Sequence, residues 1–472
     1  MKKNIKKIIG ILFILIFAII SIYFITSINN FGIIPSKYLI IIYIAMALIF
    51  GITSLLITRK NIVAYIIGII LAIIFSSVYT AASNYINTAN NAINKVVSNK
   101  VTSVNYYVLV KKDSNINKIN DLTNKKIGYM KDNNSIKLTM LLNKKIKCDA
   151  VMYEDYNKIL SDFANDTPII LNSAYVEALG DEIKTFSDTY KVIYTFTVEE
   201  DVDTTDEYKD ITSEPILVYL SGIDTYGEIS TRSRSDVNIL IAINPKTHKI
   251  LLVNTPRDYY VQLHGTTGLK DKLTHAGIYG IEKSLTTMED LYNTDINKYI
   301  RVNFNTLIKI VDKIGGIDIN SDTSFTAHTN RNVIVTQGIN HFNGEQALAY
   351  SRERYAYASG DRHRGENQQQ VITAIINKIT NTKTLINNYE DILNTLSNSF
   401  ETDFTNNEIK TFAKMQLDKK ITWDIKSISV DGTGASNYTY SMGTKNRLYV
   451  MVPDQNTVNN AKEQISQILN EK

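Results

Sequence analysis

Four arginines fall within thirteen residues of this sequence, in the run SRERYAYASGDRHRGENQQQ: Arg352, Arg354, Arg362 and Arg364. The chain otherwise carries its positive charge mainly on lysine, with 40 Lys and 11 Arg, and nine of the Arg lie between residues 232 and 364. Arginine has a planar guanidinium that holds a phosphate or carboxylate at two points, and lysine does not. The cluster favours an anion site, with surface ion pairing as the alternative.

A helix that begins near Asp361 would place three polar side chains on one face. Asp361, Arg364 and Gln368 have the spacing i, i+3 and i+7, and each residue turns a helix by about 100°. The same face continues as an apolar stripe that must meet a core: Ile372, Ile375, Ile376 and Ile379. The polar trio should therefore point inward near the helix N-terminus, where anions are favoured. Arg362 lies about 100° around this helix and is expected to face solvent.

Arg352 and Arg354 alternate in sequence, so both would point to one side if their segment were extended. Buried polar side chains are uncommon unless they are paired or functional. An internal network of salt bridges is the structural alternative to an anion site.

Apolar segments further upstream are expected to position more charged residues. Residues 216–224 read as a strand that ends at Asp224, and residues 236–244 and 249–256 read as a hairpin. The start of one hairpin strand and the end of the next lie at the same edge of a sheet. Four charged residues should therefore gather there: Arg234, Asp236, Arg257 and Asp258.

Asp224 and Asp236 are candidate ligands for a divalent cation. Carboxylate oxygens suit Mg²⁺ or Mn²⁺, and Mg²⁺ is commonly held by one or two carboxylates together with phosphate oxygens. A metal beside several arginines would form a pyrophosphate site.

Three apolar stretches of membrane-spanning length open the chain, at residues 8–28, 38–58 and 62–82. No A-x-A-like cleavage site follows the first stretch, so it is not expected to be a signal peptide. Lysines precede the first stretch and Arg59 and Lys60 fill the second loop, whereas the first loop holds only Lys37. The positive-inside rule predicts a cytoplasmic N-terminus and an extracellular chain after about residue 83. A buried helical hairpin with one anchor is the alternative.

The charge distribution argues against a nucleic-acid partner. Residues 1–100 hold nine basic and no acidic residues, and the remainder holds 42 basic and 47 acidic residues, a net charge of −5. This remainder lacks the basic balance of a nucleic-acid surface. The single cysteine, Cys148, excludes an intrachain disulfide and a cysteine-rich metal site, and is expected to be a small core residue.

The segment before the arginine-rich region reads as a separate small α/β module. Residues 83–100 are expected to be a polar connector that leaves the membrane. Short strand-like runs follow at 106–110, 126–130, 168–172 and 190–196, and an acidic linker is expected at 199–210. The predicted division is a membrane anchor at 1–83, an accessory domain with linker at 84–210 and a catalytic domain at 211–472.

Eight motifs follow one another in this last part: SGID, RSDVNILIAINP, NTPRD, KLTHAGIYG, YIRVNF, VDKIGGIDI, FNGEQALAYSRER and DRHRGENQ. Across about residues 214–455 they resemble the LytR–CpsA–Psr family of envelope phosphotransferases. The three spans and the accessory module resemble its CpsA-like branch. The resemblance implies an α/β fold, with a central β-sheet flanked by helices and a hydrophobic tunnel for a polyprenyl carrier.

The resemblance also implies transfer of a glycopolymer from undecaprenyl pyrophosphate to a cell-wall acceptor, usually peptidoglycan. Mg²⁺, with Mn²⁺ as the alternative, would lie on Asp224 and Asp236. Asp361 would act as a base or orient an arginine. Catalytic roles are also implied for Arg257, Arg352 and Arg354. The pyrophosphate would lie against seven residues: Arg234, Arg257, Arg352, Arg354, Arg364, Gln368 and Lys272.

The KLTHA segment departs from the Lys-x-Asn that the family often has near the site. The role of Thr274 is therefore open, and His275 is expected to be a structural or rim residue. Three other functions stay open: a non-catalytic binding or assembly protein for lipid pyrophosphates in polysaccharide export, a pyrophosphate hydrolase and a transcriptional attenuator. Envelope polysaccharide assembly proteins are further expected partners.

Overall fold

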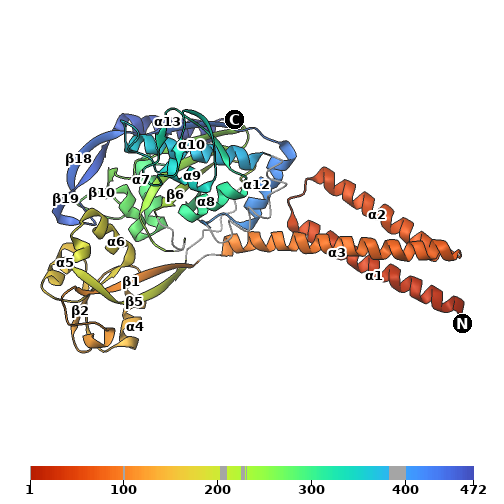
Figure 1. The fold of residues 1–472 in the computed structure, drawn as a ribbon, viewed down its shortest axis with the longest axis horizontal. Coiled ribbons are helices and arrows are strands. Elements are labelled where there is room, and N and C mark those ends of the chain that lie inside the picture. The colour runs from red at the N-terminus through yellow and green to blue at the C-terminus, as the bar shows by residue number, and fades with distance from the viewer. Residues whose placement is uncertain (1, 99–100, 202–209, 225–228, 230, 382–399) are drawn as a thin grey trace.

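The computed structural model of the chain describes residues 2–98, 101–201, 210–224, 229, 231–381 and 400–472. Figure 1 shows three parts: long N-terminal helices, a small α/β part and a larger α/β part. The long helix α3 leads from the first part towards the other two. The structure is therefore a mixed α/β fold preceded by a helical segment.

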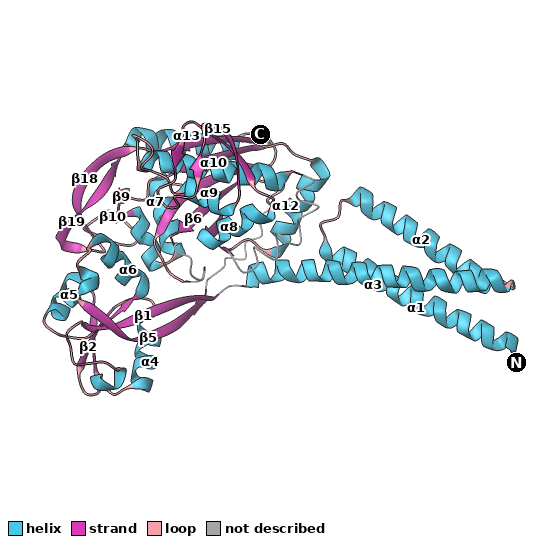
Figure 2. Cartoon of the chain, in the orientation of Figure 1, coloured by secondary structure: helices cyan, strands magenta, loops and turns pink. Residues whose placement is uncertain are grey.

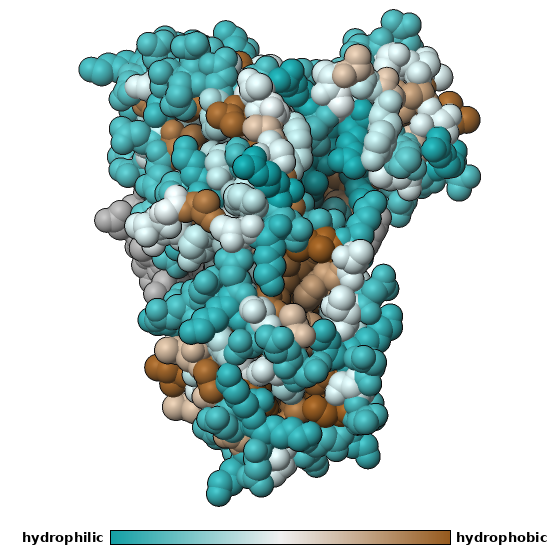
Figure 3. Space-filling view, turned by 90° about the vertical axis from the view of Figure 1, so that its left-hand side faces the viewer, coloured by the Kyte–Doolittle hydropathy of each residue, from teal (hydrophilic) through white to brown (hydrophobic). Residues whose placement is uncertain are grey.

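The N-terminal part consists of α1 (Lys2–Phe31), α2 (Ser36–Thr58) and α3 (Ile62–Ser98). All three are long and apolar enough to cross a membrane. Figure 3 views the molecule from the end that lies away from these helices, and that face is mostly hydrophilic. The expected polar connector at 83–100 is helical in its described part, because α3 extends to Ser98. This stretch contains no Gly or Pro, and extending an existing helix needs no new nucleus.

The small α/β part has one five-stranded sheet in the order β3-β2-β4-β1-β5. Its strands are β1 (Val101–Lys111), β2 (Lys126–Met130), β3 (Asp149–Tyr153), β4 (Ile169–Asn172) and β5 (Tyr190–Asp201). Its helical elements are η1 (Ile119–Leu122), α4 (Ser135–Lys145), α5 (Tyr156–Ala164), α6 (Ser173–Glu182) and η2 (Phe186–Asp188). The sequence signalled four of these strands and missed β3. Cys148 is partly buried and packs beside the core of this part. Of the expected acidic linker, residues 202–209 lie outside the described residues.

The larger part is built on a six-stranded mixed sheet in the order β16-β11-β6-β7-β8-β17. Its strands are β6 (Ile216–Ile223), β7 (Ser235–Asn244), β8 (Lys249–Asn254), β11 (Lys298–Val302), β16 (Phe400–Thr402) and β17 (Asp424–Ser429). The helices around it are α7 (Ile281–Tyr292), α8 (Phe304–Lys313), α9 (Gly344–Ser351), α10 (Asp361–Thr380), α12 (Asn406–Lys419) and α13 (Gln455–Asn470). Figure 2 shows these helices around the central strands.

Both faces of this sheet are covered, which explains why its central strands are apolar throughout. Leu217 and Tyr219 of β6 pack in one core with Met288 of α7 and Val458 of α13. The alternate residues of β6 pack on the other face, where α10 and α12 supply the covering side chains.

Smaller elements complete this part. They are β9 (Tyr260–Val261), β10 (Asp271–Lys272), η3 (Leu273–Tyr279), β12 (Ile317–Ser321), β13 (Phe325–Thr326), β14 (Ile334–Val335), β15 (Gly338–Phe342), β18 (Gly432–Thr439) and β19 (Gly443–Pro453). The predicted domain boundaries stay predictions, although β5 and β6 belong to two different sheets.

Candidate functional site

The register of the central strands brings their charged ends together. In the antiparallel pair β6 and β7, Ile223 lies opposite Ser235, so Asp224 and Arg234 follow at one edge. Asn254, which ends β8, lies opposite Ile239 of β7, so the segment after β8 reaches the same edge. The structure therefore has the arrangement that the hairpin pattern predicted.

A cavity of about 640 Å³ opens at this edge. Most of the residues that line it are charged. Six cationic residues border it: Arg234, Arg257, Lys272, Arg352, Arg354 and Arg364. Five acidic residues border it as well: Asp181, Glu182, Asp224, Asp258 and Asp361. The family resemblance implied a pyrophosphate contact for all six cations.

Asp236 lies beside this cavity and is held by two donors. Arg257 Nη1 donates to its Oδ2 at 2.5 Å, and Thr274 Oγ1 donates to its Oδ1 at 2.7 Å. Burial acts to raise the pKa of Asp236, but the charges of Arg257 and Arg234 outweigh it and hold the pKa well below its usual value. Asp236 is therefore ionised at neutral pH.

Asp224 is more open, with a side chain that is 34% exposed and lies 3.6 Å from Arg352 Nη2. Burial and the nearby negative charge of Asp236 raise the pKa of Asp224, against the charge of Arg352. Both carboxylates border the same apolar cavity. A cation bound between the two carboxylates would relieve the repulsion that raises the pKa of Asp224.

The helix α10 begins at Asp361, as the sequence predicted. Arg364 Nη2 lies 2.8 Å from Asp361 Oδ1, and Gln368 borders the same small cavity as both residues. The apolar stripe also packs as expected, although it divides between two cores: Ile375 and Ile379 in one, Ile372 and Ile376 in the other.

Arg362 is more than a solvent-facing residue. Its Nε lies 2.7 Å from Asp431 Oδ1, and its Nη2 donates to the carbonyl of Gly432 at 2.8 Å. Half of the Arg362 side chain is exposed, so it faces solvent as expected, and the other contacts arise because β18 begins beside α10. Arg362 also borders the smaller cavity.

Arg352 and Arg354 both border the large cavity, although their segment is not extended. Arg352 caps α9 with helical backbone angles, and its guanidinium lies 4.2 Å from the centre of the Phe304 ring. The buried carboxylate of Glu353 accepts the backbone N–H groups of Arg354, Tyr355 and Ala356 and so holds a turn. The turn, and not strand alternation, places the two arginines together.

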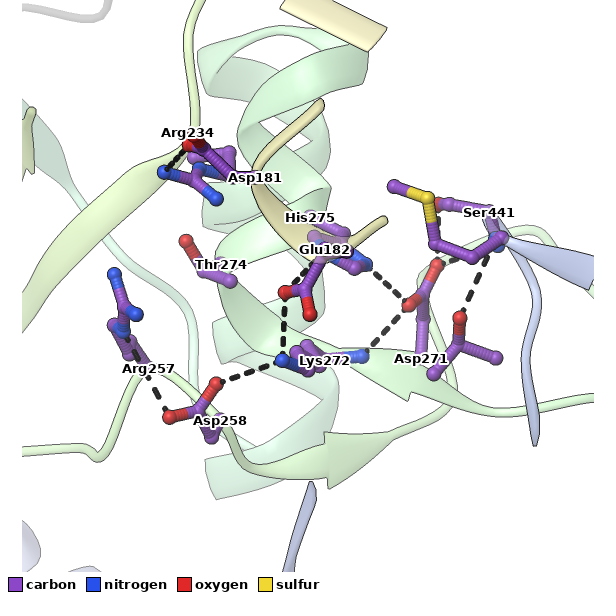
Figure 4. Close-up of polar contacts among 12 residues, drawn as sticks. Asp181, Glu182, Arg234, Arg257, Asp258, Asp271, Lys272, Thr274, His275 and Ser441 are labelled. Atoms are coloured by element: carbon purple, nitrogen blue, oxygen red, sulfur yellow. Dashed lines mark hydrogen bonds and ion pairs between the residues drawn. The ribbon is translucent and has the colours of Figure 1, made fainter. Parts of the chain in front are cut away.

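Lys272 is buried, and two carboxylates hold its ammonium. Its Nζ lies 2.6 Å from Glu182 Oε1 and 3.3 Å from Asp258 Oδ1 (Figure 4). Arg234 Nη2 lies 2.6 Å from Asp181 Oδ2. Asp181 and Glu182 belong to α6 of the small α/β part, so this part also lines the cavity.

His275 is a structural residue and does not lie at a rim, because its side chain is fully buried. Its Nδ1 lies 2.7 Å from Asp271 Oδ1. Burial lowers the pKa of His275, but the charge of Asp271 and the interaction with Glu182 raise it more, and the net direction is upward.

An apolar cavity of about 110 Å³ adjoins the charged one. Apolar side chains of several elements line it, including Ile223, Val237 and Phe304, and Asp224, Asp236 and Arg364 border it. The fold therefore places a charged cavity next to an apolar one.

Sequence reasoning missed several residues of this site. Asp181 and Glu182 carried no signal, because contacts between distant segments leave no periodic pattern. Thr274 had the KLTHA motif as its signal, and the structure now places its hydroxyl on Asp236. Asp258 was expected at the sheet edge without a role, and it lies between Arg257 and Lys272.

This arrangement can bind an anion with two phosphate groups. Within the described residues, Arg257 Nε is buried and has no hydrogen-bond partner, although Asp258 Oδ2 lies 3.7 Å away. A donor of this kind suits a phosphate oxygen. Asp224 and Asp236 can hold a divalent cation beside that anion.

The chain is similar to a well-defined group of proteins. The profile of the LytR_cpsA_psr family matches residues 183–466. A protein of Bacillus cereus named polyisoprenyl-teichoic acid–peptidoglycan teichoic acid transferase TagU is 32% identical over 268 residues, which are 56% of this chain and 84% of the relative. The protein of the same name from Enterococcus faecalis is 35% identical over 225 residues, 47% of this chain and 71% of the relative.

Among solved structures, the crystal structure of B. subtilis TagV has a TM-score of 0.46 and 25% sequence identity, and the match covers 56% of this chain and 100% of that one. The family profile covers more than half of the residues. The chain belongs to the LytR–CpsA–Psr family.

Proposed function

We propose that the chain transfers a phosphate-linked glycopolymer from a polyprenyl pyrophosphate carrier to peptidoglycan. The observation that carries this proposal is the pair of adjoining cavities, one charged and one apolar. A lipid pyrophosphate has the matching polarity, with an anionic head and an apolar tail. The names of the relatives from B. cereus and E. faecalis, transferases from a polyisoprenyl-linked teichoic acid to peptidoglycan, support the same reaction class.

The residues present fit Mg²⁺, with Mn²⁺ as the alternative. No group of three or more His, Cys, Asp or Glu that could hold a metal is found among the described residues, so the protein would supply two carboxylates and the substrate would supply oxygens. Mg²⁺ is commonly held in this way in phosphoryl-transfer sites. Asp224 and Asp236 would be its ligands, and the bound ion would offset negative charge on the phosphates.

The chain's own residues would do the rest by position and charge. Arg257, Arg352 and Arg364 would hold the two phosphates while an acceptor hydroxyl approaches the sugar-linked phosphorus. A bond forms between the acceptor oxygen and this phosphorus, the bond to the bridging oxygen breaks, and polyprenyl phosphate leaves. Asp361 borders the cavity and would accept the hydroxyl proton or orient Arg364.

The proposed location is the outer surface of a membrane, with the N-terminus in the cytoplasm. Helix α12 of the larger α/β part contacts the N-terminal helices where α1 ends: Lys410 Nζ donates to the carbonyl of Asn30 at 3.0 Å. Ile33, between α1 and α2, packs against Leu417 of α12. The basic residues Arg59 and Lys60 lie at the opposite end of α2. The positive-inside rule then puts the catalytic part outside.

The test is a transfer assay on the full chain in detergent with Mg²⁺, a polyprenyl-pyrophosphate oligosaccharide and peptidoglycan fragments. Mass spectrometry would look for a phosphodiester-linked product. Asp224→Ala and Arg352→Ala should abolish transfer while the protein stays folded, because both side chains are about one third exposed. The exposed Arg447, whose Nη1 donates to the carbonyl of Ser436, provides a matched control as Arg447→Ala.

Transfer at the normal rate by folded Asp224→Ala would contradict the proposed role of the metal site. Release of glycan phosphate without a linked product would indicate hydrolysis, and tight binding without any turnover would indicate a binding protein.

A further inference from the structure

The C-terminal end of α6 reaches from the small α/β part into the charged cavity (Figure 4). Two acids, Asp181 and Glu182, stand there together, and the last turn of α6 carries no basic residue. The negative end of a helix dipole disfavours carboxylates at this place. Cations from the larger α/β part offset this cost, because Arg234 pairs with Asp181 and Lys272 pairs with Glu182.

The two pairs differ in burial. Asp181 is 62% exposed, so its ion pair is weak and easily broken. Glu182 is 16% exposed and Lys272 is 5% exposed. Burial raises the pKa of Glu182, but its interactions with His275 and Lys272 outweigh burial and bring the pKa to about 2. Glu182 is therefore charged whenever the protein is folded at neutral pH.

Glu182 also lies near a buried histidine of the larger α/β part. His275 Nε2 lies 3.6 Å from Glu182 Oε1, and the other ring nitrogen of His275 lies 2.7 Å from Asp271. Asp271 in turn accepts the backbone N–H of Ser441 at 2.8 Å. The fully buried side chains of Asp271 and His275 therefore lead to Glu182, which pairs with the ammonium of Lys272.

We propose that Glu182 is a positioning residue for Lys272 in the transfer reaction, so that the small α/β part supplies one wall of the catalytic site. The proposal rests on the proposed function above. Lysine is a point charge on a flexible four-carbon stem, so its position depends on what holds the ammonium. Glu182 and Asp258 hold it on two sides, at the border of the cavity that would receive the phosphates. Without Glu182, the ammonium would move towards Asp258, which also lies beside Arg257.

Glu182 is not what attaches the two parts to one another. They share an apolar core in which Tyr175 and Leu179 of α6 pack with Ile278, Met442 and Leu448 of the larger part. The hydroxyl of Tyr175 also donates to the carbonyl of Ser441 at 2.8 Å. Loss of the Glu182 charge should therefore leave the two parts joined.

The experiment is a double-mutant cycle on the full chain in detergent, with Glu182→Gln, Lys272→Gln and the double variant. Steady-state transfer would be measured against donor concentration, and binding of farnesyl pyrophosphate would be measured by calorimetry. Asp188→Asn is the control, because Asp188 is an exposed acid of the same part whose carboxylate lies 3.8 Å from Lys112.

Glu182→Gln should lower kcat/KM by about tenfold, mainly through a higher KM for the donor, as expected for one lost charge-assisted hydrogen bond. In the Lys272→Gln background, Glu182→Gln should not lower kcat/KM further, because the ammonium that Glu182 positions is already absent. Asp188→Asn should match the wild type.

Two results would overturn the inference. One is normal kinetics of Glu182→Gln. The other is an equal fall in kcat/KM on Glu182→Gln with Lys272 present and with Lys272→Gln, which would indicate a purely structural role. A wild-type protein that binds farnesyl pyrophosphate but transfers nothing would refute the proposed function alone, and the same cycle in Kd would decide the role of Glu182. A wild-type protein that neither binds nor transfers would overturn both.

Discussion

Arg257→Ala should destabilise the protein and at the same time make its stability depend strongly on Mg²⁺. Arg257 Nη1 lies 2.5 Å from Asp236 Oδ2, and the two side chains are 20% and 11% exposed. Removing one partner of a buried ion pair costs about 3–5 kcal/mol, because the other charge stays buried and unpaired. The loss here should be smaller, because Thr274 still donates to Asp236 and the charge of Arg234 still lowers its pKa.

We expect a loss of about 2 kcal/mol, which corresponds to a fall in Tm of about 4–8 °C for a domain of this size. Millimolar Mg²⁺ should raise the Tm of Arg257→Ala by more than it raises the Tm of the wild type, because a cation on Asp236 replaces the missing guanidinium. A ligand that binds only the folded state stabilises it according to its concentration and Kd.

The assay is thermal unfolding of the full chain in detergent across a Mg²⁺ titration. Arg257→Lys is the matched control, because it keeps the positive charge, and its Tm should stay near that of the wild type. A Tm of Arg257→Ala that responds to Mg²⁺ no more than the wild type does would refute the reasoning that Asp236 is a metal ligand.

Thr274→Val should raise the Mg²⁺ concentration needed for half-maximal transfer by about tenfold, because a partner that orients a metal ligand is lost; an unchanged Mg²⁺ profile would argue against a metal on Asp236. The pKa of Glu182 is lowered in the folded state, to about 2, so its contribution to stability is present above about pH 4.5 and is lost as the pH falls towards 2. Chemical unfolding of wild type and Glu182→Gln should therefore differ by a constant amount from pH 7 to 5 and converge as the pH falls towards 2; a gap that keeps its full size down to pH 2.5 would contradict this. Gly277→Ala should destabilise by about 1–3 kcal/mol, because the added Cβ would lie 2.5 Å from the carbonyl oxygen of Ser233; an unaltered Tm would show that η3 can move away from β7.

Much of the site could be read from the sequence, because strand ends and helical phase are local properties. The apolar runs of β6, β7 and β8 predicted which charged residues share an edge. The spacing of Asp361, Arg364 and Gln368 predicted a shared helical face, and these residues border one cavity. Each inference needed only the geometry of one element or one hairpin.

The remaining features depended on contacts that no local pattern encodes. Arg352 and Arg354 were expected from strand alternation, but Glu353 between them forms a turn through three backbone N–H groups. The polar composition after residue 83 indicated a connector but not its helical structure, and α3 continues to Ser98 through a stretch without Gly or Pro. Glu182 reaches Lys272 across 90 residues of sequence, through packing of two separate sheets.

In the proposed reaction, the sugar-linked phosphate moves with the glycan. A donor that carries ³²P only in this phosphate would be incubated with the full chain, Mg²⁺ and peptidoglycan fragments. The label should appear in the peptidoglycan product with wild type and not with Asp224→Ala. Label that stays with the polyprenyl product, or that is released as free glycan phosphate, would contradict it.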